Sequence, residues 1–409
     1  MPRYTFRALA VLLVLCAAVR ARAQTNQTLL SYGMDTYNKT DSSLLVPNGN
    51  GLFAETASLN GTQSGGDSGF SFVWPASTQM RVYDALVRID PGTYTPVLRQ
   101  FSDQLDARYW TSSTGGYRSG VSAGATQFYD DNAHMAVALM GAYNLTHDSV
   151  YLSRAMSTYN FVLSGEDDSA QSGGGGIYFN TDKTFKDSAA TLQGTRAALL
   201  LYQATGQQHY LDDATRLYTW EKNTLQQPDG LFGEKYYVTG PQAGTISTTT
   251  LVNFAAFGLE DNILFFDVTH DPAYLAEAER IGNRTLTRYF SSTTGAIQDE
   301  GHWAFELVNA LDDLSLTDNN PLYLQKVQSA MLWLHDNGQD PNGHYGTLWG
   351  RAGTVTTAYS SWNLNDMAPV AESYLYTGLA PEPVGLPLVA GLVLLMRRRR
   401  VRKGDSLLA

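Results

Sequence analysis

The strongest constraint on the fold of this chain is a helix-pair motif that recurs along it. Four segments share the pattern Tyr-Leu-x-x-small, and each opens an amphipathic stretch just after a turn: they begin at Tyr151, Tyr210, Tyr274 and Tyr323. Their spacings of 59, 64 and 49 residues fit helix pairs joined by loops of variable length. Each is preceded by a more apolar helical stretch, so the repeating unit predicts one outer and one buried inner helix.

Extending this alternation in both directions predicts six outer and six inner helices. The outer helices are expected to begin near Gln27, Tyr94, Ser149, Gln208, Pro272 and Pro321. The inner helices are expected to begin near Pro75, Asp131, Ser188, Leu251, His302 and Trp362. Six plus six is the count of an all-α (α/α)6 toroid, in which the outer ring buries the inner one.

A second repeat marks the loops that return from an outer to an inner helix. Each return has a glycine followed by an aromatic or apolar residue, beginning at Gly51, Gly116, Gly176, Gly230, Gly295 and Gly343. Glycine permits the positive-φ turns that short returns need. Because all six loops lead into inner helices, we expect them to meet the inner N-termini at one rim, which is the expected pocket.

The two ends of the chain carry signals rather than helix pairs. Residues 1–23 combine Arg3 and Arg7 with an apolar run and small residues before Gln24, which is typical of an export signal. The one cysteine, Cys16, lies inside this signal, so the mature chain is expected to have no disulfide.

At the other end, Pro381-Glu382-Pro383 is followed by thirteen apolar residues and a basic cluster. Thirteen is short of the roughly 20 residues of a spanning helix, although a short membrane anchor is one interpretation. The order of these features resembles the bacterial PEP-CTERM sorting tag. We therefore expect a signal peptide (1–23), one domain (24–378) and a sorting segment (379–409), processed by signal peptidase and exosortase after transient membrane contact. The expected location is the exterior or surface of a bacterium.

The charge of the mature domain limits its partners. The formal charge of −11 becomes −19 over residues 24–380 once the four arginines of the signal and the net +4 of the tail are set aside. So acidic a surface should repel nucleic acid and anionic glycans, which leaves neutral ligands. The histidines are scattered and no metal-site motif occurs, so we expect no metal and no cofactor. We also expect the protein to be a monomer.

Asp130 and Asp131 head an apolar helix at the expected rim. Two adjacent aspartates also fit an ordinary helix N-terminus, and such pairs recur at 167–168, 212–213 and 312–313. The expected helices place Asp212-Asp213 on an outer helix and Asp312-Asp313 deep within or beyond an inner one, whereas Asp130-Asp131 is at the rim. Two carboxylates beside a pocket suit a metal, a cap, or the acid and nucleophile of a glycosidase.

The same rim is rich in aromatic and amide side chains, which suit the C–H faces and hydroxyls of a neutral glycan. The candidate substrate-binding residues are Trp74, Tyr129, Asn132, Tyr178, Asn253, His302, Trp303, Trp349 and Trp362. Core packing is the alternative role of each aromatic residue in this set.

The segment Tyr129-Asp130-Asp131-Asn132-Ala133 resembles the central motif of glycoside hydrolase family 76, the α-1,6-mannanases, which have the (α/α)6 fold. Looser matches at 186–189, Asn253 and 301–303 extend the resemblance over about residues 75–376. The resemblance implies an endo-α-1,6-mannanase-like retaining glycosidase, with Asp130 as nucleophile and Asp131 as acid/base.

The chain departs from the family where it has His134 in place of the usual tryptophan, and Val252-Asn253-Phe254-Ala255 in place of the usual asparagine segment. Two other functions stay open. A sugar epimerase or uronide hydrolase of the same fold would favour a catalytic histidine pair or a basic rim, and a non-catalytic surface glycan-binding protein would not need the aspartate pair.

Overall fold

The computed structural model describes residues 2–351 and 353–381, with side chains described from Ala23 onward. The predicted sorting segment therefore lies outside the described residues from residue 382 on, and so do the side chains of the predicted signal before Ala23.

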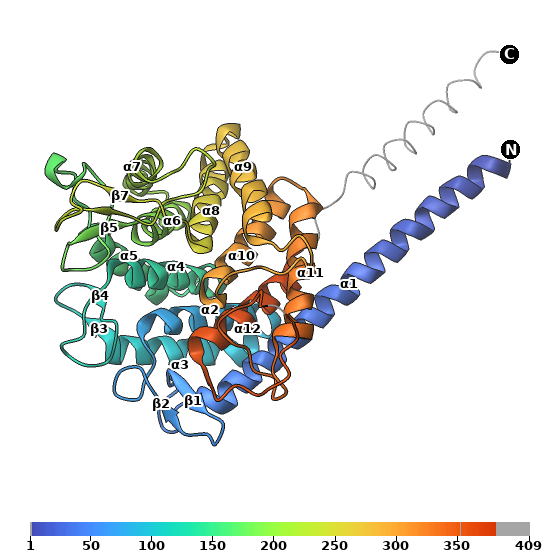
Figure 1. Ribbon diagram of the computed structural model, residues 1–409, viewed down its shortest axis with the longest axis horizontal. Helices are drawn as coiled ribbons and strands as arrows, with labels where there is room; N and C mark the ends of the chain where they lie inside the picture. Colours follow the sequence, from blue (N-terminus) through green and yellow to red (C-terminus); the bar gives the residue numbers. More distant parts are fainter. Residues whose placement is uncertain (1, 352, 382–409) are drawn as a thin grey trace, which may run out of the picture.

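Within these limits, twelve α-helices form two concentric rings (Figure 1). The inner helices are α2 (Val73–Ile89), α4 (Tyr129–Thr146), α6 (Ser188–Thr205), α8 (Val252–Thr269), α10 (Gly301–Thr317) and α12 (Leu364–Leu379). The outer helices are α1 (Pro2–Leu44), α3 (Pro91–Tyr109), α5 (Ser149–Leu163), α7 (Gln208–Thr224), α9 (Pro272–Tyr289) and α11 (Pro321–Gly338). The predicted all-α (α/α)6 toroid is confirmed.

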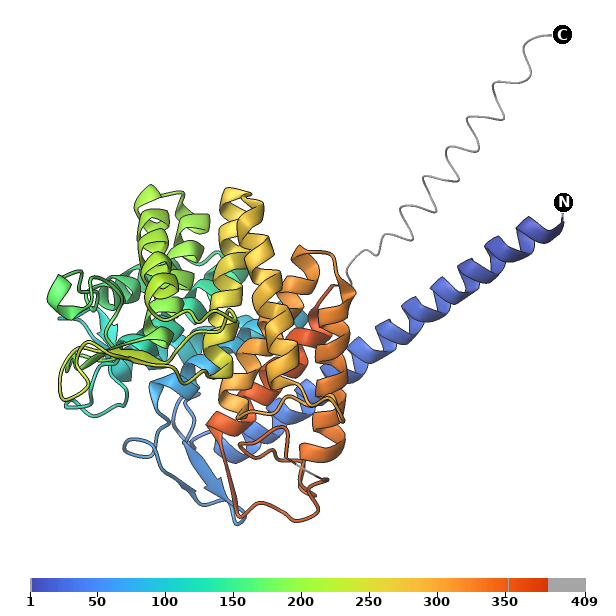
Figure 2. The same cartoon turned by 45° about the horizontal axis from the view of Figure 1, so that its top comes forward.

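The inner ring is closed because each inner helix contacts the next and α12 contacts α2. Each of the outer helices α3, α5, α7, α9 and α11 packs on the inner helix that precedes it in the chain, and α1 packs on α12. Figures 1 and 2 show this last contact, which joins the first helix of the chain to the last one. The pairing of α1 with α12 completes the outer ring.

The first helix is longer than predicted. An outer helix was expected near Gln27, whereas α1 runs without a break from Pro2 to Leu44. The sequence has no proline after Pro2 and no glycine before Gly33 in this stretch, so nothing interrupts the helix. Among the described residues, no helix has both the length and the apolarity needed to cross a membrane.

The helix α4 shows why the inner ring is buried. Its residues from Asn132 to Met140 are all buried, with no polar stripe for solvent. The helix ends at His147, which takes the left-handed conformation with φ of 54°. The outer helix α5 then starts from Asp148, whose side chain accepts a hydrogen bond from the backbone N–H of Val150.

The six return loops follow the predicted glycine motif. Five of the predicted glycines have φ between +75° and +96°, and in the return that contains Gly116 the preceding Gly115 takes that conformation. The residue after the glycine turns back into the core: Tyr117, for example, is buried and pairs with Trp110 at the end of α3. Each outer helix is thus tied to its own return loop at the rim.

Eight short strands also lie in these loops. They are β1 (Thr56–Ser58), β2 (Gln63–Ser64), β3 (Trp110–Thr111), β4 (Gly116–Tyr117), β5 (Phe185–Asp187), β6 (Lys235–Tyr237), β7 (Ile246–Ser247) and β8 (Ser361–Asn363). They form three antiparallel sheets, with orders β2-β1-β8, β3-β4 and β5-β6-β7. Because β5 ends where α6 begins, its pairing with β6 sets the position of the first turn of that inner helix.

Candidate active site

A pocket of about 600 Å³ lies at the rim formed by the N-terminal ends of the inner helices. Helices α2, α4, α6, α8 and α10 contribute to it together with the loops that precede them. Its lining residues are Phe72, Trp74, Ser119, Thr126, Phe128, Asp130, Asp131, His134, Phe179, Asp187, Ala189, Glu234, Leu251, Asn253, Phe254 and Trp303. A pocket is therefore present where the return loops predict one.

Asp130 and Asp131 line this pocket from the first turn of α4. The N-cap residue of the helix is Phe128, so neither aspartate is the cap. Oδ1 of Asp130 is buried and has no hydrogen-bond partner among the described residues. Burial, together with the charges of Asp131 and Asp187, raises the pKa of Asp130 well above its usual value.

Burial also raises the pKa of Asp131, to about 7. Two such carboxylates side by side cannot both be ionised at neutral pH, so the pair retains a proton there. A retained proton at the surface of a pocket is what general-acid chemistry requires.

A third carboxylate, that of Asp187, lines the same pocket. Its Oδ1 accepts a hydrogen bond of 3.1 Å from the backbone N–H of Ala190 and so caps α6. Burial raises the pKa of Asp187 to about 7, against the helix N–H groups, which lower it. The sequence analysis used residues 186–189 as a loose family match before a helix and gave Asp187 no role, because a cap aspartate has the same sequence pattern whether or not it also faces a pocket.

Glu234 is a fourth acidic residue in the lining, and it too was missed from the sequence. It lies directly before β6, where Lys235 pairs with it at 2.7 Å and the hydroxyl of Ser247 donates to it at 3.1 Å. Both oxygens of Glu234 thus have a partner, whereas Oδ1 of Asp130 has none among the described residues. The sequence signal was weak, since Glu234 belongs to no helix start.

Three of the predicted substrate-binding residues line the pocket, namely Trp74, Asn253 and Trp303. Nε1 of Trp74 and Oδ1 of Asn253 are buried without a hydrogen-bond partner among the described residues, so the protein leaves both polar atoms unpaired. His302 lies behind this wall: its ring meets that of Trp74 edge-on at 5.4 Å, and its Nε2 pairs with Glu300 at 3.0 Å.

Phenylalanines form much of the rest of the wall, and none of them was predicted. Phe128 and Phe179 meet edge-on with ring centroids 5.1 Å apart, and Phe72 and Phe254 lie at the starts of α2 and α8. Phe72 is 42% exposed although it is a large apolar residue. The sequence prediction considered Trp, Tyr, amide and His residues but no Phe, whereas Phe at the residue before an inner helix was the available signal.

Three other predicted residues are used by the fold instead. Tyr129 stacks on Phe161 with ring centroids 5.0 Å apart, and Tyr178 is buried in the same apolar cluster. Oδ1 of Asn132 accepts a hydrogen bond of 2.7 Å from the backbone N–H of Tyr117, and Nδ2 of Asn132 donates to the Tyr117 carbonyl at 2.9 Å. Asn132 therefore ties the return loop to α4, and none of the three is in the pocket lining.

Trp349 and Trp362 are also outside the lining. Trp349 is buried against Gly301, where an added Cβ would lie only 2.1 Å from its Nε1. Trp362, on β8, stacks on His344 with ring centroids 3.7 Å apart. Trp349 therefore packs on the start of α10, and Trp362 packs within the return loop before α12.

The described side chains include no group of three or more His, Cys, Asp or Glu residues arranged to hold a metal ion. The chemistry that these residues offer is that of paired carboxylates with retained protons, set among aromatic faces and unpaired polar atoms. Such a site suits proton transfer and nucleophilic attack on a substrate with many hydroxyls.

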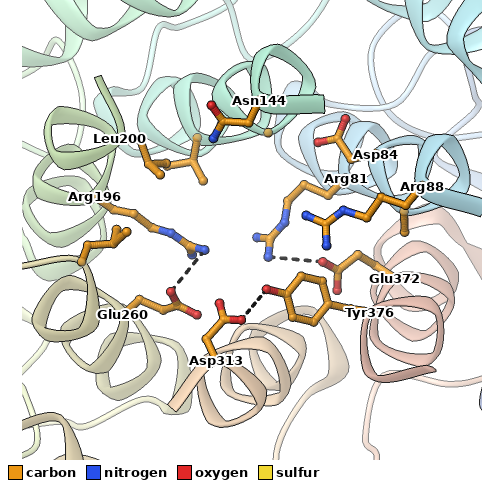
Figure 3. Close-up of a pocket in the computed structure, with 14 residues that line it drawn as sticks. Arg81, Asp84, Arg88, Asn144, Arg196, Leu200, Glu260, Asp313, Glu372 and Tyr376 are labelled. Carbon is orange, nitrogen blue, oxygen red and sulfur yellow. Dashed lines mark hydrogen bonds and ion pairs between the residues drawn. The ribbon is translucent and has the colours of Figure 1, made fainter. Parts of the chain in front are cut away.

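A second cavity, of about 200 Å³, lies on the axis of the toroid toward the C-terminal ends of the inner helices. Figure 3 shows Arg81 and Arg196 extending into it from α2 and α6, each beside a carboxylate. Arg81 pairs with Glu372 at 3.3 Å, and Arg196 pairs with Glu260 at 3.6 Å. Glu306, on α10, pairs with Arg81 at 2.7 Å and with Arg196 at 3.4 Å.

Comparison with known proteins agrees with this architecture. The model of a protein family described as glycosyl hydrolase family 76 matches residues 54–304. A search of curated protein sequences gave no match.

Several solved structures share the fold. A family 76 α-mannanase of Bacteroides thetaiotaomicron is 24% identical, with a TM-score of 0.77 over 86% of this chain and 95% of that one. An α-1,6-mannanase of Salegentibacter sp. HEL1_6 is 18% identical, with a TM-score of 0.72 over 86% of this chain and 100% of that one. That enzyme was solved with α-1,6-mannotriose as an inactive variant in which two consecutive aspartates are replaced by asparagine. A sugar epimerase from a ruminal bacterium is 12% identical, with a TM-score of 0.64 over 87% of this chain and 99% of that one.

Proposed function

The chain belongs to glycosyl hydrolase family 76, and from that premise we propose that it hydrolyses an α-1,6-linked mannan by double displacement on Asp130 and Asp131. The observation that carries the proposal is the aspartate pair itself, which lines an aromatic pocket with both pKa values raised. The Salegentibacter enzyme, whose inactive variant changes two consecutive aspartates, supports the same assignment.

In the proposed mechanism, Asp130 attacks the anomeric carbon while Asp131 protonates the departing glycosidic oxygen. Asp131 then removes a proton from water, which attacks the covalent glycosyl intermediate and releases a product with retained configuration. A pKa of about 7 suits this double role, because an acid/base must change its protonation state within the cycle.

The nucleophile has to be ionised, although burial raises the pKa of Asp130 as well. Because the two carboxylates titrate as a pair, the shared proton can reside on Asp131 while Asp130 is free to attack. The charge of ionised Asp187 raises the pKa of Asp130 further, and the pKa of Asp187 itself is about 7, so Asp187 opposes ionisation of the nucleophile once it has lost its own proton.

The pocket lining argues against an epimerase that uses two histidines. His134 is the one histidine among the lining residues, and no lysine or arginine is present to bind a uronate. The likeness to the sugar epimerase is a likeness of fold at 12% identity. Trp74 and Trp303 instead offer flat faces to a neutral sugar.

Three further proposals concern the whole chain. Residues 1–23 direct export, residues 24–378 form a monomeric catalytic domain, and residues 379–409 sort the protein to the bacterial surface. Mass spectrometry of the protein recovered from the producing cells would locate both processing sites, and an intact C-terminus in surface-exposed protein would contradict the sorting role.

The activity is tested by incubating the purified domain with linear and branched mannans and with other neutral glycans, followed by product identification. The expected result is release of α-1,6-linked mannooligosaccharides of more than one length, as an endo-acting enzyme produces. Turnover of another glycan with none of the mannans would overturn the proposed substrate, and release of mannose alone would overturn endo action.

A further inference from the structure

His134 lies four residues after Asp130 on α4, so the two side chains are on the same face of the helix, about one turn apart. His134 lines the pocket and is 7% exposed. Its ring meets that of Phe257 edge-on at 5.5 Å and is 6.2 Å from that of Trp74. The imidazole is therefore held between aromatic rings at the inner end of the pocket.

One ring nitrogen of His134 faces away from the pocket, toward Gln193. Nε2 of Gln193 is 3.2 Å from Nδ1 of His134 and 3.5 Å from Oε1 of Glu306. Although burial raises the pKa of Glu306, Arg81 and Arg196 lower it below its usual value, so Glu306 is an ionised acceptor. The amide of Gln193 must then present its NH2 group to Glu306, because its oxygen would meet another acceptor.

This orientation determines the tautomer of His134. The same NH2 group also faces Nδ1, which therefore accepts a hydrogen bond, and the proton of the neutral ring resides on Nε2. The ring is neutral because burial lowers the pKa of His134 to about 4, although Glu306 raises it. His134 is thus a neutral N–H donor.

Nε2 itself is unused by the protein. Among the described residues it has no hydrogen-bond partner, and it is not one of the fully buried unpartnered atoms. Glu306, which orients Gln193, is itself paired with Arg81 and Arg196, and these arginines also pair with Glu372 and Glu260 beside the axial cavity (Figure 3). A donor with a defined direction is therefore left for whatever fills the pocket.

We propose that His134 is a specificity-determining residue whose Nε2–H donates a hydrogen bond to one hydroxyl of the sugar bound over Asp130. This inference rests on the proposed function, since it takes the sugar at Asp130 to be the one that is cleaved. A pocket that hydrogen-bonds a substrate hydroxyl discriminates against an analogue without it, because the buried donor is then left unpaired. The expected substrates present a free hydroxyl at that position, and sugars deoxygenated or methylated there are rejected.

The test is a set of kcat/KM measurements on an aryl α-1,6-mannobioside and on analogues that lack one hydroxyl of the cleaved sugar. For the wild type, one analogue is expected to lose roughly 10-fold to 100-fold in kcat/KM, about 1.4 to 2.7 kcal/mol at 1.36 kcal/mol per tenfold. His134→Phe should lose a similar factor on the parent substrate and no further factor on that analogue. His134→Gln, which keeps an N–H donor, should recover part of the loss.

Phe257→Leu is the matched control, because Phe257 packs on the imidazole without a polar group. It should lower kcat/KM equally for the parent and for every analogue. Circular dichroism and thermal unfolding of each variant establish that it is folded.

If the factor lost in kcat/KM through His134→Phe multiplies with the factor lost through every missing hydroxyl, His134 contacts none of those hydroxyls. That result would overturn the inference while leaving the proposed function in place. Absence of turnover by the wild type on every mannoside would instead overturn the proposed function. Nitrogen NMR of the 15N-histidine-labelled wild type is a second measurement that needs no turnover. It should show the proton of His134 on Nε2, and a proton on Nδ1 would overturn the inference.

Discussion

Glu221 provides a quantitative test of the claim that carboxylates around the start of α6 retain protons. It lies on α7 and is fully buried. Ser188 is the first residue of α6, and its Oγ lies 2.5 Å from Oε1 of Glu221 and also 2.5 Å from the carbonyl oxygen of Gly233. One hydroxyl hydrogen cannot serve both acceptors, whereas a protonated Glu221 supplies the second hydrogen.

The effect on stability follows from the pKa of Glu221. Burial raises it from 4.5 to about 8, and the charge of Asp187 adds to the increase. Because the folded pKa lies above the unfolded one, the contribution of the protonated group is fully present below about pH 4.5 and is lost as the pH rises toward about 8. Between about pH 5 and about pH 7.5, this one group should lower the free energy of unfolding by roughly 3 kcal/mol.

Glu221→Gln removes this titration and keeps a donor toward Ser188. Between about pH 5 and about pH 7.5, the free energy of unfolding of the variant relative to that of the wild type should therefore increase by roughly 3 kcal/mol. The assay is urea unfolding followed by circular dichroism at both pH values. Asp212→Asn, an exposed change on the same helix, is the control and should shift stability by less than about 0.5 kcal/mol at either pH. An equal pH dependence of the Glu221→Gln variant and the wild type would refute the claim that Glu221 is protonated.

Three other predictions concern the axis and the rim. Glu306→Gln should destabilise the domain by about 3 to 5 kcal/mol in urea unfolding, because it removes the buried charge that Arg81 faces at 2.7 Å; unchanged stability would show that the pair is replaceable. Gly258→Ala should cost about 1 to 3 kcal/mol, since the new Cβ would lie 2.2 Å from the ring of Phe232; a higher melting temperature would contradict this. Asp187→Asn should keep the helix cap and move the acidic limb of the kcat/KM pH profile to lower pH, because a negative charge that raises the pKa of the nucleophile is gone; an unmoved limb would show that Asp187 does not act on the pair.

The helices could be predicted from the sequence because their signals are local. The alternation of apolar and amphipathic stretches located all twelve helices of the described residues, and the glycine motif located the returns. The starts at Ser149, Ser188, Gln208, Pro272 and Pro321 agree to the residue with the structure. The packing of α1 on α12 was not predicted, because the two helices lie at opposite ends of the domain sequence and no local pattern links them.

The pocket lining was predicted less completely because it depends on the direction of each side chain. Trp303 and Trp349 both lie near the rim, yet one lines the pocket and the other packs against Gly301. Trp349 comes to lie on Gly301 because Leu348 pairs with Glu300, a contact between two distant loops that no local pattern encodes. Asp187 shows the converse case, since its cap role hid its second position at the pocket.

The roles of Asp130 and Asp131 are tested most directly by azide rescue with an activated aryl α-mannoside, whose leaving group needs little protonation. Asp131→Asn should still form the glycosyl intermediate, and azide should restore turnover and give a mannosyl azide of retained configuration. Asp130→Asn should show neither turnover nor rescue to a retained product. Wild-type rates in both variants would show that the pair is not catalytic, and an inverted product from the wild type or from Asp131→Asn would contradict the nucleophilic role of Asp130.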